Sequence, residues 1–107
     1  MWTGEGRKIY LQALFDKIKD GAEMRYYSGD VELCAIKLTA PVAVLENSAI
    51  IFNYAEAVAV GRGTADKAIL RVENTDILEL KIPDNMTLEP REVLPGAIIK
   101  LDDFIIQ

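Results

Sequence analysis

The chain of 107 residues contains no histidine and a single cysteine, Cys34. Histidine is the commonest general base, so its absence excludes the usual serine and cysteine catalytic triads. One cysteine cannot form an internal disulfide, so the fold requires no oxidising compartment. Cys34 shares a predicted strand face with apolar neighbours, where we expect a core thiol rather than a nucleophile. These absences predict that the protein is not an enzyme and holds no metal or other cofactor.

Carboxylate pairs are the remaining catalytic option in the sequence. Asp102 and Asp103 are adjacent, and neighbours on a strand point to opposite faces, so they cannot share a substrate there. Asp30 and Glu32 have the spacing that places both on one side of a strand. The 12-residue loop of a dedicated calcium motif is absent around them, which favours a solvated turn. A carboxylate-dependent hydrolase is therefore only the third hypothesis for this chain.

The sequence also lacks long apolar segments and an excess of positive charge. Its longest apolar runs, such as residues 49–52, are far shorter than the ~20 residues that span a bilayer, and residues 1–8 lack the apolar stretch of a signal peptide. Twelve Lys and Arg against 17 Asp and Glu give a formal net charge of −5, which repels phosphate backbones. We therefore expect neither a nucleic-acid nor a membrane partner, and a soluble protein inside the producing cell.

A change in hydrophobic period divides the chain near Gly21. Over residues 7–20 the apolar side chains recur at helical spacing, as shown by Leu11, Leu14, Phe15 and Ile18. Gly21 stands where a left-handed residue would end that helix. No repeat, low-complexity tract or linker follows, and half of the residues are hydrophobic, which suffices for a core. We expect one domain over residues 1–107, with a helix at about 7–20 and a β-sandwich at about 22–107.

The remainder of the chain predicts about six or seven short strands with turn signals between them. In the clearest hairpin, residues 74–76 form the turn, and Leu78 and Leu80 alternate with charged residues on the returning strand. Residues 42–48 are ambiguous, and residues 55–60 fit either a strand or a loop. The pattern indicates a mainly β fold with one N-terminal α-helix, built as an antiparallel β-sandwich or barrel with the helix packed at an edge or end. The predicted strands are 24–27, 32–38, 50–54, 68–73, 77–82, 97–101 and 104–106.

Four residues are candidates for contact with a partner: Tyr27, Asp30, Arg62 and Tyr54. Trp2 is a further aromatic of interest. Tyrosine and tryptophan are enriched where one protein anchors on another. Tyr26 and Tyr27 must point to opposite faces of a regular strand, which allows one of them to be exposed, although packing in the core or at an edge is the more usual place for each. Tyr27 with Asp30 is the one pairing of an aromatic and a carboxylate suited to a glycan. Arg62 lies in a glycine-flanked turn, which lacks the Gly-Lys-Ser/Thr ending of a phosphate loop, and is placed to contact an acidic partner.

The order of several short segments is similar to that of small proteins encoded among the virion genes of tailed phages and prophages. These segments are LQAL at 11–14, DGAEMRYYSG at 20–29, GTA at 63–65, LRVEN at 70–74 and PGAII at 95–99. The resemblance implies a β-sandwich structural component that assembles on a head or a tail, and therefore a location in the cytoplasm of the producing cell or in a virion. It carries no catalytic residues over to this chain.

Two hypotheses of function follow from these observations. The first is a non-enzymatic structural or accessory protein of phage or prophage type that acts through protein–protein assembly. We expect a homo-oligomer, because small sheets with open edges and surplus apolar surface bury both by association. The alternative is a small β-sandwich binding module that holds a glycan or a peptide near residues 28–30 and 61–64.

Overall fold

The computed structural model describes residues 4–47, 49–82, 84–88, 91–102 and 104–107, and within them one helix precedes eleven strands. The helix is α1 (Gly4–Ile18). The strands are β1 (Gly21–Ser28), β2 (Val31–Thr39), β3 (Ala43–Glu46), β4 (Ala49–Phe52), β5 (Ala55–Val58), β6 (Gly63–Thr64), β7 (Lys67–Val72), β8 (Thr75–Lys81), β9 (Glu92–Val93), β10 (Ile98–Leu101) and β11 (Ile105–Ile106).

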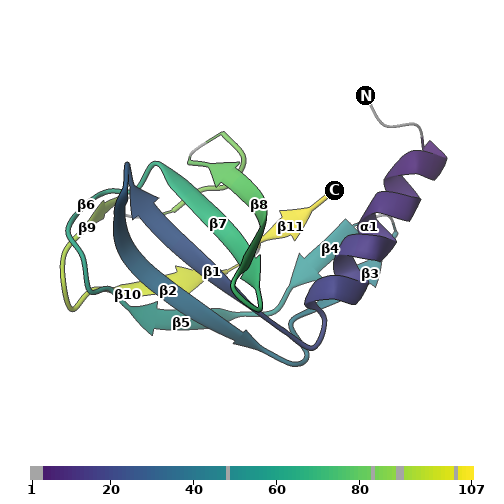
Figure 1. Ribbon diagram of the computed structural model, residues 1–107, viewed down its shortest axis with the longest axis horizontal. Helices are drawn as coiled ribbons and strands as arrows, with labels where there is room; N and C mark the ends of the chain where they lie inside the picture. The colour runs from purple at the N-terminus through teal and green to yellow at the C-terminus, as the bar shows by residue number, and fades with distance from the viewer. Residues whose placement is uncertain (1–3, 48, 83, 89–90, 103) are drawn as a thin grey trace.

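The strands form one main sheet and three smaller antiparallel units (Figure 1). The main sheet has the order β2-β1-β7-β8, and each neighbouring pair is antiparallel. A three-stranded sheet has the order β11-β4-β3, and the pairs β10-β5 and β6-β9 form two ribbons. No sheet closes on itself within the described part of the chain, so the architecture is a sandwich. The predicted fold class is therefore confirmed.

The core forms because most strands have one apolar face. In β7, the buried residues Ala68, Leu70 and Val72 alternate with partly exposed ones. The same alternation holds in the first and second strands, so the inner face of the main sheet is apolar and its outer face is polar. Removing such aliphatic side chains from water contributes roughly 1.5–3 kcal/mol each.

The helix packs at one end of the sandwich, next to the three-stranded sheet (Figure 1). Leu11, Leu14 and Ile18 are buried and join the common core cluster, as the helical spacing predicts. Within the described residues the helix begins at Gly4 and ends at Ile18, so both predicted boundaries were a few residues too late. Gly21 is not a left-handed cap. It is the first residue of β1 and has an extended φ of 159°.

The clearest predicted hairpin is correct in its strands and wrong in its turn. The turn lies at Glu73 and Asn74, which have φ angles of 50° and 67°, and Thr75 already belongs to β8. Two consecutive residues with positive φ match the right-handed twist of the flanking strands, which explains why this tight turn replaces the predicted one at residues 74–76.

The ambiguous segments are partly strands. Residues 42–48 contain β3, and residues 55–60 contain β5. The two-residue strands β6 and β9 are not predicted by the sequence, and they pair with each other. Strands of this length have too few residues to show a period of two, so the count of six or seven strands was too low.

Candidate functional site

Three of the four predicted contact residues lie at one end of the sandwich. We call it the loop end, defined by residues 27–33 and 60–64. The amides of Val60 and Gly61 both donate to the carbonyl oxygen of Leu33, with N to O distances of 2.8 and 3.1 Å. A Cβ atom built at Gly63 would lie 2.7 Å from the Cβ atom of Ser28. The structure therefore brings Tyr27, Asp30 and Arg62 to the same end.

Tyr27 is half-buried on the outer face of the main sheet. It lies opposite Glu32 on one neighbouring strand and Lys67 on the other. The Lys67 ammonium group is 5.5 Å from the centroid of the Tyr27 ring, which is within the range of a cation–π contact. Tyr26 is completely buried, whereas Tyr27 is half-buried, so neither of the two tyrosines is fully exposed. A ligand that stacks on Tyr27 has to share the ring with Lys67.

Asp30 is exposed in the turn between β1 and β2. The preceding Gly29 is left-handed, with a φ of 59°, and its amide lies 3.1 and 3.2 Å from the two carboxylate oxygens of Asp66. Asp66 therefore holds this turn, and the sequence analysis missed it because the two residues are far apart along the chain. Glu32 is paired with Arg25 instead of acting together with Asp30.

Arg62 is exposed beside a close approach of two chain segments. A Cβ atom at Gly61 would lie 2.3 Å from the carbonyl oxygen of Glu32, so only glycine fits there. Arg62 itself makes no hydrogen bond or ion pair with the residues that the structure describes. Contact of Arg62 with an acidic group of a partner stays a prediction.

Tyr54 is separate from the other three candidates. Tyr54 precedes β5, whereas residues 60–64 of the loop end follow that strand. The Tyr54 residue is 53% exposed. Its hydroxyl donates to Oε2 of Glu56 at 3.3 Å. Partial desolvation, followed by the charges of Glu56 and Asp102, raises the pKa of Tyr54. The other predicted aromatic, Trp2, lies outside the described residues, as does Asp103.

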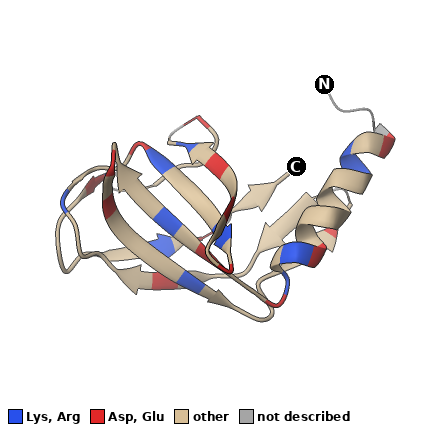
Figure 2. Cartoon of the chain, viewed as in Figure 1, with Lys and Arg blue, Asp and Glu red and all other residues tan. Residues whose placement is uncertain are grey.

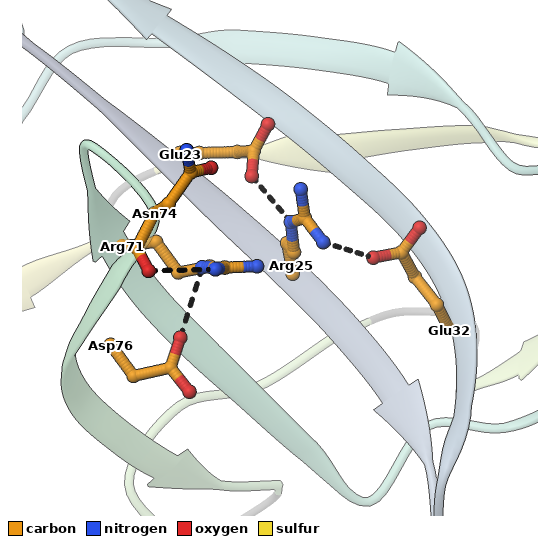
Figure 3. Close-up of polar contacts among 6 residues, drawn as sticks. All are labelled: Glu23, Arg25, Glu32, Arg71, Asn74 and Asp76. Atoms are coloured by element: carbon orange, nitrogen blue, oxygen red, sulfur yellow. Dashed lines mark hydrogen bonds and ion pairs between the residues drawn. The ribbon is translucent and has the colours of Figure 1, made fainter.

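The outer face of the main sheet carries charges of both signs in close pairs (Figure 2). Figure 3 shows Arg25 between Glu23 and Glu32; its Nη1 is 3.0 Å from Oε1 of Glu32, and its Nε contacts the carboxylate of Glu23. The hydrogen bond to Glu23 is the main reason that the pKa of Arg25 is raised. The Arg25 charge is therefore matched by acids, and it does not present a free phosphate-binding site.

A second ion pair lies on the same face, near the β7–β8 turn. The Nε atom of Arg71 is 2.9 Å from Oδ1 of Asp76, and its Nη2 donates to the Asn74 carbonyl oxygen at 2.9 Å (Figure 3). Because Asp76 is largely exposed, this pair contributes at most about 1 kcal/mol to stability. The contact to Asn74 also fixes the arginine against the turn.

Cys34 is completely buried in the core, as predicted. Burial, followed by the charge of Glu32, raises the pKa of its thiol. A raised pKa keeps sulfur in the unreactive thiol form at neutral pH. Among the described residues there is also no group of three or more His, Cys, Asp or Glu side chains placed to hold a metal ion.

None of the four predicted contact residues lines either of two hollows on the described surface. The larger has a volume of about 580 Å³ and lies where the end of α1, the start of β1 and the β7–β8 turn meet. Its lining carries charges of both signs, including Lys17, Lys37 and Glu73. The smaller, of about 310 Å³, lies between residues 84–87 and the segment that follows β10.

Exposed aliphatic side chains form a patch on the three-stranded sheet. Val44, Ile51 and Ile105 are directly paired across β3, β4 and β11, so they form one row on one face. Val44 and Ile105 are 41% and 44% exposed, and Ile51 is half-buried. We call these three residues the row patch.

A second aliphatic patch lies on the β10–β5 ribbon. Val58 is paired with Ile98, and both are 58% exposed. Val60 and Leu94 are also exposed, and a hydrogen bond from the Gly96 amide to the Ala59 carbonyl oxygen holds their two loops together. We call Val58, Val60, Leu94 and Ile98 the ribbon patch. The sequence analysis predicted neither patch, because each depends on which strands are neighbours.

No protein-family model, curated protein or solved structure matches this chain. No helix in the described part of the chain has the length and apolar character that a membrane crossing requires. The functional argument therefore depends on the chain's own surface.

Proposed function

We propose that this chain is a non-enzymatic structural or accessory protein of phage or prophage type, and that it acts through protein–protein assembly. The observation that supports this proposal is the presence of the row patch and the ribbon patch on solvent-facing sheet surfaces. Isolated exposed hydrophobic residues are ordinary, but contiguous groups mark surfaces that bind partners. The resemblance of the sequence to small virion-associated proteins agrees with this function.

The strand edges indicate that association uses sheet faces rather than edge-to-edge pairing. The edge strand β8 of the main sheet carries the exposed charged residues Asp76, Glu79 and Lys81. Charges on an edge strand oppose the addition of another strand. The residues of the two aliphatic patches are themselves uncharged, and we propose that a partner covers them.

The oligomeric state tests this proposal. We expect the wild-type chain to form oligomers in size-exclusion chromatography with light scattering, and Val58→Asp to shift it toward the monomer. Thr39→Asp is the matched control, because Thr39 is exposed on a strand outside both patches. A wild-type chain that stays monomeric at high concentration and does not bind phage particles would contradict assembly.

A second candidate function is the binding of a glycan or a peptide at the loop end. It is supported by the placement of Tyr27, Asp30 and Arg62 at the same end of the sandwich. Array screening of the wild-type chain tests it, with Tyr27→Ala expected to abolish binding. Tyr54→Ala is the control, because this exposed tyrosine lies away from the loop end. Binding that is equally strong in both variants would exclude the loop end as the site.

A further inference from the structure

We propose that copies of this chain join head to tail, with the ribbon patch of one copy seated on the row patch of the next. This inference rests on the proposed assembly function and specifies its interface. The three-stranded sheet lies beside α1 toward one end of the long axis, whereas the patch end of the β10–β5 ribbon lies toward the other end, near β6 and β9 (Figure 1). The molecule measures 42 Å along that axis, so one copy can present both patches to different neighbours.

The two patches are alike in chemistry and in shape. Each is built on directly paired strand residues, Val44 with Ile51 in one and Val58 with Ile98 in the other. Cross-strand pairs stand side by side on a sheet face, so each patch has two adjacent aliphatic side chains at its centre. Two such faces can stack at the spacing of packed sheets, about 10 Å, with their side chains interdigitated.

Charges next to the patches distinguish a head-to-tail joint from a two-fold joint. Glu46 follows Val44 by two residues on β3 and therefore faces the same side. Arg62 is exposed in the loop after β5, two residues beyond Val60 of the ribbon patch. Neither Glu46 nor Arg62 makes a hydrogen bond or an ion pair with other described residues. A head-to-tail joint brings the acid of one copy toward the cation of the next. A joint between identical patches would bring like charges together, which opposes association.

A contact between two different patches of the same chain has a consequence for assembly. Each joined copy still presents one free patch of each kind, so addition continues until the rotation between copies closes a ring, or a filament grows. A two-fold contact would stop at a dimer. Head-to-tail joining is therefore suited to a protein that builds a larger structure from copies of one small chain.

Two blocked variants test the arrangement by light scattering and sedimentation, separately and mixed. In the ribbon-blocked variant, Val58→Asp and Ile98→Asp charge one patch; in the row-blocked variant, Val44→Asp and Ile105→Asp charge the other. All four side chains are exposed, so we expect native circular dichroism spectra. Each variant alone should be monomeric where the wild-type chain is oligomeric. An equimolar mixture should form a dimer and nothing larger, because only one complementary pair of patches remains.

The outcomes separate this inference from the proposed function. A blocked variant that dimerises by itself, or a mixture that stays monomeric while the wild-type chain assembles, would overturn head-to-tail joining and leave assembly intact. A wild-type chain that stays monomeric at high concentration would overturn head-to-tail joining, and one that also fails to bind phage particles would contradict the proposed function itself.

A charge exchange gives a second test that does not alter the aliphatic residues. Glu46→Arg or Arg62→Glu alone should weaken association about tenfold at low salt, and the double variant should restore it. The double variant restores the pair because each joint again brings one acid and one cation together. Two single variants that leave association unchanged would contradict the proposed contact.

Discussion

Replacing Tyr26 by phenylalanine removes an oxygen atom that the core leaves without a partner. The Tyr26 side chain is completely buried, opposite Cys34 on β2 and Ala68 on β7, and its hydroxyl makes no hydrogen bond to the described residues. A buried hydroxyl without a partner destabilises a protein by about 1–3 kcal/mol. We expect Tyr26→Phe to raise the free energy of unfolding by about 1 kcal/mol, near the lower limit, because the removed oxygen leaves a small void.

Denaturant unfolding of the two proteins measures this difference, and thermal melting provides an independent check. A gain of about 1 kcal/mol corresponds to a rise in melting temperature of roughly 4–8 °C for a domain of this size. Tyr27→Phe is the control, because the neighbouring hydroxyl interacts with Arg25 and its loss should not increase stability. A loss of 1 kcal/mol or more in Tyr26→Phe would refute the reasoning, because the hydroxyl would then have a partner in solution.

The stability gain of Tyr26→Phe is expected to depend on pH. Burial, followed by the charge of Cys34, raises the pKa of Tyr26 above its ordinary value of 10.0. Above about pH 10 the unfolded chain therefore loses this proton while the folded chain keeps it, and the stability of the wild-type protein falls as the pH rises. Phenylalanine has no such proton. The stability advantage of Tyr26→Phe should widen between pH 10 and 11, by at most about 1.4 kcal/mol per pH unit, and a narrowing would contradict the assignment.

Three further predictions concern the loop end, the buried thiol and the charged sheet face. Gly61→Ala should lower the free energy of unfolding by about 3 kcal/mol, because its Cβ would collide with the Glu32 carbonyl oxygen. Gly29→Ala should lower it by only about 1 kcal/mol, because the new side chain would have to adopt a left-handed backbone conformation. Equal losses of the two variants in denaturant unfolding would contradict the close approach at Gly61. Cys34 should react with a thiol reagent at the rate at which the protein opens, and immediate labelling of the native chain would show that it is not buried. Arg25→Met should lower the free energy of unfolding by about 1 kcal/mol or less, because it removes the ion pairs with Glu23 and Glu32. The loss should be smaller in 1 M NaCl, which screens these charges. A loss that is independent of salt would show that Arg25 stabilises the protein by packing rather than by charge.

The fold class was predictable because burial imposes a period on each element. The helical spacing of Leu11, Leu14 and Ile18 identifies the buried side of α1, and the alternation through Leu70 and Val72 identifies the inner face of β7. These patterns depend only on neighbours in sequence. They are therefore visible without knowing which strand pairs with which.

Strand order and exact turns were not predictable, because the burial pattern of a strand depends only on its neighbours in sequence. β1 pairs with β7 on one side, more than 35 residues further along the chain, and alternation in each strand says nothing about this choice. The hairpin turn consists of Glu73 and Asn74, both with positive φ. Glu73 is not a usual turn residue, whereas Asn74 and Asp76, in the predicted turn, are of residue types common in turns. The pairing of Val72 with Thr75 fixes a two-residue turn, and that register outweighs the preference of a single residue.

The candidate site was predictable in its residues and not in its grouping. Exposure of Arg62 follows from its charge and from the glycines on either side of it, whereas Tyr54 ends a predicted strand and its exposure was not predicted. The loop end depends on the Leu33 carbonyl oxygen, which accepts two amides from residues 60 and 61, and on Asp66, which holds the turn before Asp30. Such contacts join segments that are distant in sequence and that carry no shared pattern.

The row patch nevertheless has a sequence signal, and the signal lies in β4. Its residues Ala49, Ile50, Ile51 and Phe52 are apolar at consecutive positions, so the strand offers an apolar surface on both faces. Ile50 and Phe52 enter the core, and Ile51 faces outward in line with Val44. A strand that is apolar on both faces is typical of sheets covered on both sides, whereas an antiparallel strand facing water alternates apolar with polar residues. The apolar run in β4 covers four residues, against three in β7 (68–70) and two in β8 (77–78), and the second copy that we propose at the row patch would cover its outer face.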